Sequence, residues 1–122
     1  MFMKVKCIKT SIKNNSPRII NRDVEGYLTV GDIFFVYGLR FDGAITYIYL
    51  YEGEHLIEVP LELFEIIDNR VEKSWIIKYN IDGDCTFWPE LFYENNFLEN
   101  FVDREKEERD KFFLLQNSIE KG

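Results

Sequence analysis

The side chains that could do chemistry are few and lie far apart in the sequence. The chain has one histidine, His55, which stands between Glu54 and Leu56. A histidine can act as a general base, but it then needs a nucleophile or a second acid within reach. The neighbouring positions offer only glutamates that are typical of a surface turn. We therefore expect His55 to be an exposed turn residue and the chain not to be an enzyme; an enzyme that uses His55 is the alternative.

Metal and cofactor sites are not indicated either. Cys7 and Cys85 are 78 positions apart and belong to no Cys-x-x-Cys or Cys/His pattern of the kind that binds zinc. The segment Asp82-Gly83-Asp84 places two carboxylates on one loop, and hard cations prefer such oxygen ligands, but the rest of a calcium-binding loop is missing. No glycine-rich phosphate-binding motif occurs. We expect no metal, no cofactor and two reduced thiols; the alternatives are a cation at the Asp82/Asp84 loop and one disulfide between Cys7 and Cys85.

Length and composition predict one globular domain over residues 1–122. The chain has 122 residues, and 46% of them are hydrophobic, with 11 Phe, 7 Tyr and 2 Trp. This content excludes a disordered chain, because the aromatic side chains alone provide a large apolar surface to bury. No apolar run approaches the roughly 18 residues of a membrane span, and the N-terminal segment lacks the unbroken apolar stretch of a signal peptide. We expect a cytoplasmic protein with no membrane partner.

Charge is distributed unevenly along the chain. The net charge is −7, which argues against a protein that binds nucleic acid over its whole surface. Residues 1–22 contain six basic and no acidic side chains. Residues 82–110 contain ten acidic and three basic side chains, which is a local charge of −7. The chain therefore has a basic N-terminal segment and an acidic remainder.

Periodicity and turn residues predict several short strands in residues 1–92. Val5 and Cys7 alternate with lysines, as in a strand with one solvated face. A β-rich run over 33–38 predicts one strand, which is followed by Asp42-Gly43, a strong hairpin signal, and by a strand over 44–51. After a turn at 52–55, a short turn or helical bend is expected at 60–63. Further strands are expected at 64–67, 75–79 and 85–88.

The period changes in the C-terminal part of the chain. Asn96 followed by Glu99 resembles a capping box and predicts a helix over 96–117. Its middle is charged on nearly every side, with favourable i,i+4 pairs Glu105–Arg109 and Glu107–Lys111. Strands followed by one helix predict an α+β fold: a small, strongly bent antiparallel sheet or an SH3-like barrel, followed by a C-terminal helix.

The acidic segment 82–110 mixes carboxylates with large aromatic side chains. Aromatic anchors inside a charged rim are typical of tight protein interfaces, and carboxylates would accelerate the approach of a basic partner. The alternative is that the aromatics belong to the core and the acids to a solvated face. The predicted partner-binding residues are Asp82, Asp84, Trp88, Glu90, Tyr93 and Glu94, with Glu105 and Glu108 as secondary candidates.

The basic N-terminal segment gives a second hypothesis. Small barrels bind single-stranded nucleic acid with exposed aromatics beside a basic groove. Lys4, Lys6 and Lys9 would line one face of an extended segment, and the aromatics would be Tyr47, Tyr49 or Tyr51. Lysines on an edge strand also prevent sheet-to-sheet aggregation, which is the alternative explanation.

Several segments together resemble one group of small bacterial proteins. The resemblance covers residues 27–113 and depends on turn glycines and core aromatics. The segments are Tyr27-Leu28-Thr29-Val30-Gly31-Asp32, Val36-Tyr37-Gly38, Pro60, Leu63-Phe64-Glu65-Ile66-Ile67-Asp68 and Trp75. Proteins with this pattern resemble immunity proteins of polymorphic toxins, including those of contact-dependent growth inhibition systems.

The resemblance implies an antitoxin that works by binding. Many such toxins are basic nucleases, and an acidic protein can cover the active site or the substrate surface without a catalytic group. Negative charge also raises the rate of encounter with a basic toxin. We therefore expect an immunity protein that neutralises a cognate toxin domain; a small-barrel protein that binds single-stranded nucleic acid is the alternative.

Overall fold

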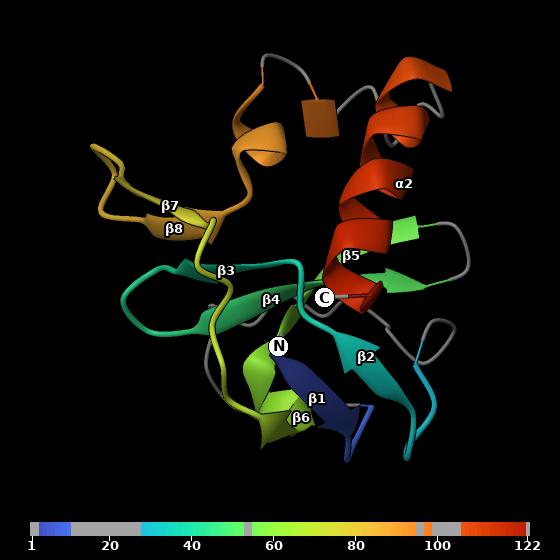
Figure 1. Cartoon of the computed structure of the whole chain (residues 1–122). Helices are drawn as coiled ribbons and strands as arrows, with labels where there is room; N and C mark the ends of the chain where they lie inside the picture. Colours follow the sequence, from blue (N-terminus) through green and yellow to red (C-terminus); the bar gives the residue numbers. More distant parts are fainter. Residues whose placement is uncertain (1–2, 11–27, 53–54, 95–96, 99–105, 122) are drawn as a thin grey trace.

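The computed structural model describes residues 3–10, 28–52, 55–94, 97–98 and 106–121 (Figure 1). These residues form two antiparallel sheets and a long C-terminal helix, α2 (Lys106–Lys121). The α+β class predicted from the sequence is confirmed. Of the two predicted forms of the β part, the barrel is wrong, because the strands form two open sheets and close into no barrel.

The smaller sheet has three strands and the larger has five. The smaller sheet has the order β2-β1-β6 and consists of β1 (Lys4–Cys7), β2 (Ile33–Phe35) and β6 (Phe64–Asp68). The larger sheet has the order β5-β4-β3-β8-β7 and consists of β3 (Gly38–Phe41), β4 (Thr46–Glu52), β5 (His55–Pro60), β7 (Ile76–Tyr79) and β8 (Cys85–Trp88). Two 3₁₀ helices, η1 (Leu61–Leu63) and η2 (Glu90–Tyr93), follow β5 and β8.

The β-rich run over 33–38 passes from one sheet to the other, so the prediction of a single strand there is wrong. The N–H of Val36 donates to the carbonyl of Met3, beside the smaller sheet, at 2.9 Å. The N–H of Tyr37 donates to the carbonyl of Tyr49, in the larger sheet, also at 2.9 Å. Two neighbouring residues thus bond to different sheets. A strand that changes sheets in this way forms a corner between packed layers.

The hairpin predicted at Asp42-Gly43 is confirmed. β3 and β4 pair antiparallel from Gly38–Tyr49 to Phe41–Thr46. The side chain of Asp42 accepts hydrogen bonds from the N–H groups of Ala44 and Ile45, at 3.2 and 2.8 Å. Gly43 has φ +91°, a conformation that side chains disfavour.

The sequence interpretation omitted β5 and η2. β5 pairs with β4 along its whole length, from Glu52–His55 to Tyr47–Pro60. Its sequence has two adjacent apolar residues, Leu56 and Ile57, and then Glu58, so it lacks the alternation that marks a half-buried strand. The pairing with β4 therefore defines this strand, and its own pattern does not. The bend predicted at 60–63 is confirmed as η1.

Apolar clusters cover both faces of the larger sheet. One lies between the two sheets and contains Val5, Phe34, Val36, Leu39, Ile48, Leu50, Val59, Leu63 and Phe64 among its buried members. The other lies between the larger sheet and α2 and contains Tyr37, Tyr49, Phe92, Phe97, Phe112 and Ile119. Alternate residues of β4 point into the two clusters, as the pleat of a strand requires. Only a strand in the middle of such a stack is buried on both faces.

The C-terminal helix extends to Lys121, four residues beyond the predicted end. Phe97 and Leu98 are helical, but the predicted cap residues Asn96 and Glu99 lie outside the described residues. The predicted pair between Glu107 and Lys111 is confirmed, with an Oε1–Nζ distance of 3.6 Å. The predicted pair of Glu105 with Arg109 lies outside the described residues, because Glu105 does.

Phe112 is the aromatic side chain by which α2 docks. It is 1% exposed, and its ring lies 5.2 Å from that of Tyr37 and 4.9 Å from that of Tyr51. We expect Phe112→Ala to lower the free energy of unfolding by about 3–5 kcal/mol, because it leaves a cavity against both rings. Urea denaturation monitored by circular dichroism measures this loss.

The matched control is Phe113→Ala, the same change at the next helical position. Phe113 is 46% exposed. We expect this variant to stay within about 0.5 kcal/mol of the parent protein, as surface substitutions usually do. Equal losses in the two variants would contradict the docking of α2 through Phe112.

Candidate protein-binding surface

The structure brings the six primary candidate residues to the β7–β8 hairpin and the turn that follows it. Asp82 and Asp84 lie in the loop between the two strands, and Trp88 is the last residue of β8. Glu90 and Tyr93 begin and end η2, and Glu94 follows it. In Figure 1 this hairpin projects to the left, away from β1, β2 and β6. Of the secondary candidates, Glu108 is half-buried on α2, and Glu105 lies outside the described residues.

The aromatic candidates pack inward. The ring of Trp88 lies 5.0 Å from that of Tyr93 and 5.5 Å from that of Tyr49, and both candidate rings are half-buried. The hydroxyl of Tyr93 donates to the carbonyl of Ile76 at 2.8 Å and lies 2.7 Å from the hydroxyl of Thr86. These two side chains therefore hold the hairpin, η2 and the sheet together, and they offer a partner only part of their surface.

The position of Trp88 also explains a glycine in β3. A Cβ atom at Gly38 would lie 2.9 Å from Cδ1 of Trp88 and 3.3 Å from the carbonyl oxygen of Phe87. Both distances are shorter than ordinary van der Waals contacts. The indole of Trp88 can lie over β3 only because residue 38 has no side chain.

Two of the four carboxylates among the primary candidate residues form ion pairs within the chain. Asp84 accepts a hydrogen bond from Nη1 of Arg40 at 3.2 Å, and Glu94 accepts one from Nζ of Lys111 at 2.9 Å. The hydrogen bond to Glu94 raises the pKa of Lys111 above its ordinary value. Asp82 and Glu90 are exposed, and within the part of the chain that the structure describes they make no ion pair. These two carboxylates are the charges that a partner would meet.

A polar cluster that the sequence did not indicate lies beside the acidic loop. Nε and Nη2 of Arg40 donate to the two carboxylate oxygens of Glu58, at 2.8 and 2.9 Å. The hydroxyl of Tyr49 also donates to Glu58, and the guanidinium of Arg40 lies 4.4 Å from the ring centre of Tyr47. The Arg40 and Glu58 side chains are only 20% and 22% exposed. Their separation by 18 positions, on strands β3 and β5, hides this pair from sequence reasoning.

This cluster is suited to holding strands together and not to proton transfer. Burial, and to a smaller extent the hydrogen bond to Glu58, raises the pKa of Tyr49 far above its ordinary value, so its hydroxyl stays protonated. The hydrogen bonds to Glu58 raise the pKa of Arg40 as well, so the guanidinium stays charged. Arg40 thereby links β3 to β5 and, through Asp84, to the β7–β8 loop. The cluster fixes the loop that carries Asp82.

The other sequence candidates stay apart from one another. His55 begins β5 and lies opposite Glu52 in the β4–β5 pairing. Cys7 and Cys85 are free thiols in different sheets, and burial raises the pKa of Cys7. Among the described residues, no three His, Cys, Asp or Glu side chains come together as a metal site would require.

The residues nominated for nucleic-acid binding do not form a stacking surface. Tyr47 and Tyr49 are buried, and Tyr51 packs against Phe112. Lys4 lies over the ring of Phe35, and Lys9 pairs with Glu62 at 3.4 Å. The nucleic-acid alternative therefore loses the buried rings of Tyr47 and Tyr49 and retains only the half-buried ring of Tyr51.

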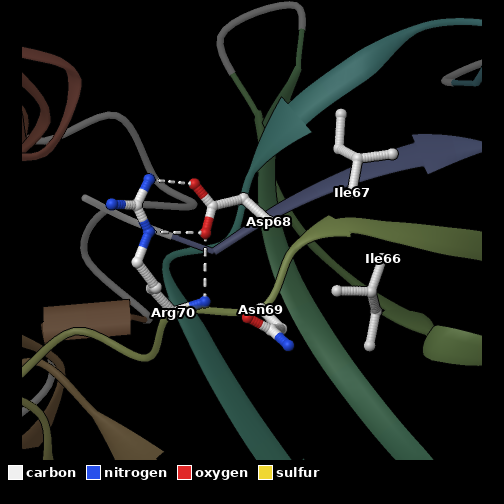
Figure 2. Close-up of a pocket in the computed structure, with 5 residues that line it drawn as sticks. All are labelled: Ile66, Ile67, Asp68, Asn69 and Arg70. Atoms are coloured by element: carbon white, nitrogen blue, oxygen red, sulfur yellow. Dashed lines mark hydrogen bonds and ion pairs between the residues drawn. The ribbon is translucent and has the colours of Figure 1, made fainter.

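An open hollow lies at the end of β6, lined by residues 66–70. Figure 2 shows Arg70 turned back onto Asp68, with its Nε and Nη2 at 2.9 and 2.6 Å from the two carboxylate oxygens. These hydrogen bonds lower the pKa of Asp68 below its ordinary range. Since the two charges satisfy each other, the hollow offers a ligand little polar recognition.

No protein-family model, curated protein or solved structure matches this chain. Within the described residues, no helix is long and apolar enough to cross a membrane. Function must therefore be inferred from the arrangement of the side chains.

Removal of the Arg40 side chain tests the role of the polar cluster. Arg40→Gln leaves the Glu58 carboxylate largely buried without its cation, so we expect a loss of about 2 kcal/mol in the free energy of unfolding. The matched control is Arg70→Gln, which removes an equally bidentate pair whose guanidinium is 58% exposed, compared with 20% for Arg40, and should cost less. Urea denaturation measures both, and a larger loss in the control would contradict the assignment.

Alkaline pH tests the state of the Tyr49 hydroxyl. Above about pH 10 the unfolded chain releases tyrosine protons, whereas folded Tyr49 keeps its proton, so unfolding releases a proton and stability falls as pH rises. This residue contributes up to about 1.4 kcal/mol per pH unit in that range. We expect Tyr49→Phe to show a shallower decline between pH 8 and about 11.5 than the parent protein. Identical declines in denaturation midpoints would contradict a raised pKa.

Proposed function

We propose that this chain is an immunity protein, which binds a cognate secreted bacterial toxin domain and neutralises it. The observation that carries the proposal is the composition of the β7–β8 hairpin surface. Asp82, in the loop of the hairpin, and Glu90, at the start of η2, are exposed carboxylates without an ion pair among the described residues, and Ile77 and Tyr79 are exposed apolar side chains of β7. Charge beside an apolar centre suits a protein partner, because apolar contact supplies affinity and charge supplies orientation.

The sign of the charge favours a basic partner. The chain carries a net charge of −7, and residues 82–110 alone carry −7. A surface of this kind attracts a cationic domain over a distance and accelerates association, which matters when the free partner is toxic. We expect the toxin to be a nuclease, because enzymes that bind phosphate backbones present basic surfaces.

Neutralisation of this kind requires only that the toxin's active site or substrate surface be covered. The resemblance of residues 27–113 to immunity proteins supports the same function. The complex would form in the cytoplasm, where a nuclease toxin reaches its substrate.

The proposal is tested with a tagged form of the chain expressed in its native strain. We expect it to retain a basic polypeptide in a 1:1 complex at low salt. That polypeptide should arrest growth when expressed alone and cease to do so when the chain is expressed with it. Failure to relieve the arrest would overturn the proposal, and so would salt-dependent micromolar binding to single-stranded DNA or RNA without any toxin complex.

Charge reversal tests where the toxin binds. We expect the double variant Asp82→Lys/Glu90→Lys to weaken the complex about tenfold or more at low salt, mainly through slower association, and to reduce its salt dependence. The control Asp32→Lys/Glu65→Lys makes the same change in net charge at exposed positions elsewhere and should bind more tightly than the test variant. Surface plasmon resonance at several salt concentrations separates the two. Equal weakening would mean that net charge alone matters.

A further inference from the structure

β7 is an edge strand whose outward backbone groups are unpaired among the described residues. It is the outermost strand of the larger sheet, and all four of its residues are exposed. The N–H of Asn80 donates to the carbonyl of Asp84 at 2.8 Å. In an antiparallel pair the bonded residues alternate, so Lys78 and Ile76 bond toward β8. The N–H and C=O groups of Ile77 and Tyr79 therefore point away from the sheet.

The same strand presents a row of apolar side chains. Ile77 is 62% exposed and Tyr79 is 78% exposed. Both lie on the face that carries their cross-strand neighbours Phe87 and Cys85, and Phe41 continues this face on β3. Figure 1 shows that the hairpin extends beyond the smaller sheet, which covers the central strands of this face. The outer part of the face is thus left uncovered by the smaller sheet.

The other edge strands carry features that discourage pairing, and β7 lacks them. β2 has only three residues, and β6 has an irregular register and two carboxylates, Glu65 and Asp68. β5 ends in Pro60, which has no N–H to donate. The lysine in β7 gives no such protection, because Nζ of Lys78 lies over the ring of Tyr93, 4.4 Å from its centre. β7 is therefore the edge most open to another strand.

Charge indicates what kind of strand would pair there. The adjoining loop carries the exposed carboxylate of Asp82, and Glu90 follows β8. A second copy of the chain would bring the same acidic groups together and has a net charge of −7 of its own, which opposes self-association. A segment rich in Lys or Arg would instead find complementary charge.

We propose that β7 is a docking strand, to which an extended basic segment of a partner protein adds as a sixth strand of the larger sheet. This inference deepens the proposed function, since the partner would be the toxin domain. The outward N–H and C=O groups of Ile77 and Tyr79 would supply the backbone hydrogen bonds. Apolar side chains of the added strand would cover Ile77 and Tyr79, and basic ones would face Asp82. Backbone bonds give affinity in such strand addition, and alternate side chains give specificity.

The test uses a synthetic peptide, so it does not depend on finding the toxin. The probe is an acetylated and amidated peptide of alternating lysine and valine, titrated into the ¹⁵N-labelled protein. We expect the largest changes in amide chemical shift at Ile77 and Tyr79, and slower hydrogen exchange of the same two amides. The control peptide has the same sequence with alternate backbone nitrogens methylated, which keeps the charge and removes the donors. It should bind about tenfold more weakly.

Protein variants complete the experiment. Ile77→Lys places a cation on β7, whereas Ile33→Lys makes the same change on β2 at a residue that is 59% exposed. We expect the first variant to lose peptide binding and the second to keep it. Tyr79→Lys repeats the test at a second position, and the amide spectra show whether each variant is folded.

The inference is overturned if the peptide changes the chemical shifts of amides outside β7 most strongly, or if the methylated peptide binds equally well. It is also overturned if Ile77→Lys and Ile33→Lys bind the peptide equally well. Self-association through β7, seen by sedimentation and abolished by Ile77→Lys, would also overturn it. If the peptide binds at β7 but the chain does not relieve the growth arrest caused by any toxin, the inference about the docking strand stands. Only the proposed immunity function is then rejected.

Discussion

The structure depends on the burial of β4 on both of its faces. Ile48 and Leu50 are fully buried against the smaller sheet, and Tyr49 is buried toward α2. The pleat sends alternate side chains into the two clusters, so this one strand joins both apolar cores. The smaller sheet and the helix each cover one face of the same central strands. Neither of these layers could bury its own apolar side chains without the larger sheet.

The Arg40 cluster is a polar exception on the helix side of this sheet. A largely buried guanidinium is tolerable there because Glu58 meets it with both oxygens, Asp84 adds a further acceptor, and the ring of Tyr47 lies beneath it. The cluster joins β3 to β5 across β4 by side-chain hydrogen bonds, in addition to the backbone pairing of these strands. It also connects the rigid centre of the molecule to the acidic loop, so the loop that we assign to partner binding is held by the fold itself.

The burial of the larger sheet by the layers packed against it decreases from its central strands toward β7. The central strands lie between two apolar layers, whereas Ile77 and Tyr79 are largely exposed. Exposed apolar side chains on an unguarded edge are a hazard in a free protein and an advantage in a complex, because a partner strand removes them from water. The exposed carboxylates near this edge would discourage self-pairing and, under the proposed function, would attract a basic protein.

The amino-acid sequence by itself determined the features that depend on neighbouring residues. Local turn chemistry and periodicity predict the turn at Asp42-Gly43, the alternating strand at Val5 and Cys7, the strand at 85–88 and the α+β class. Only the tertiary structure decided that the run at 33–38 divides between two sheets and that β5 exists. It also decided that Arg40 pairs with Asp84, and that Trp88 packs inward while Tyr79 remains exposed. Each of these depends on a partner that is distant in the sequence, and pairing between distant residues is set by the competition among all possible contacts, which no local pattern records.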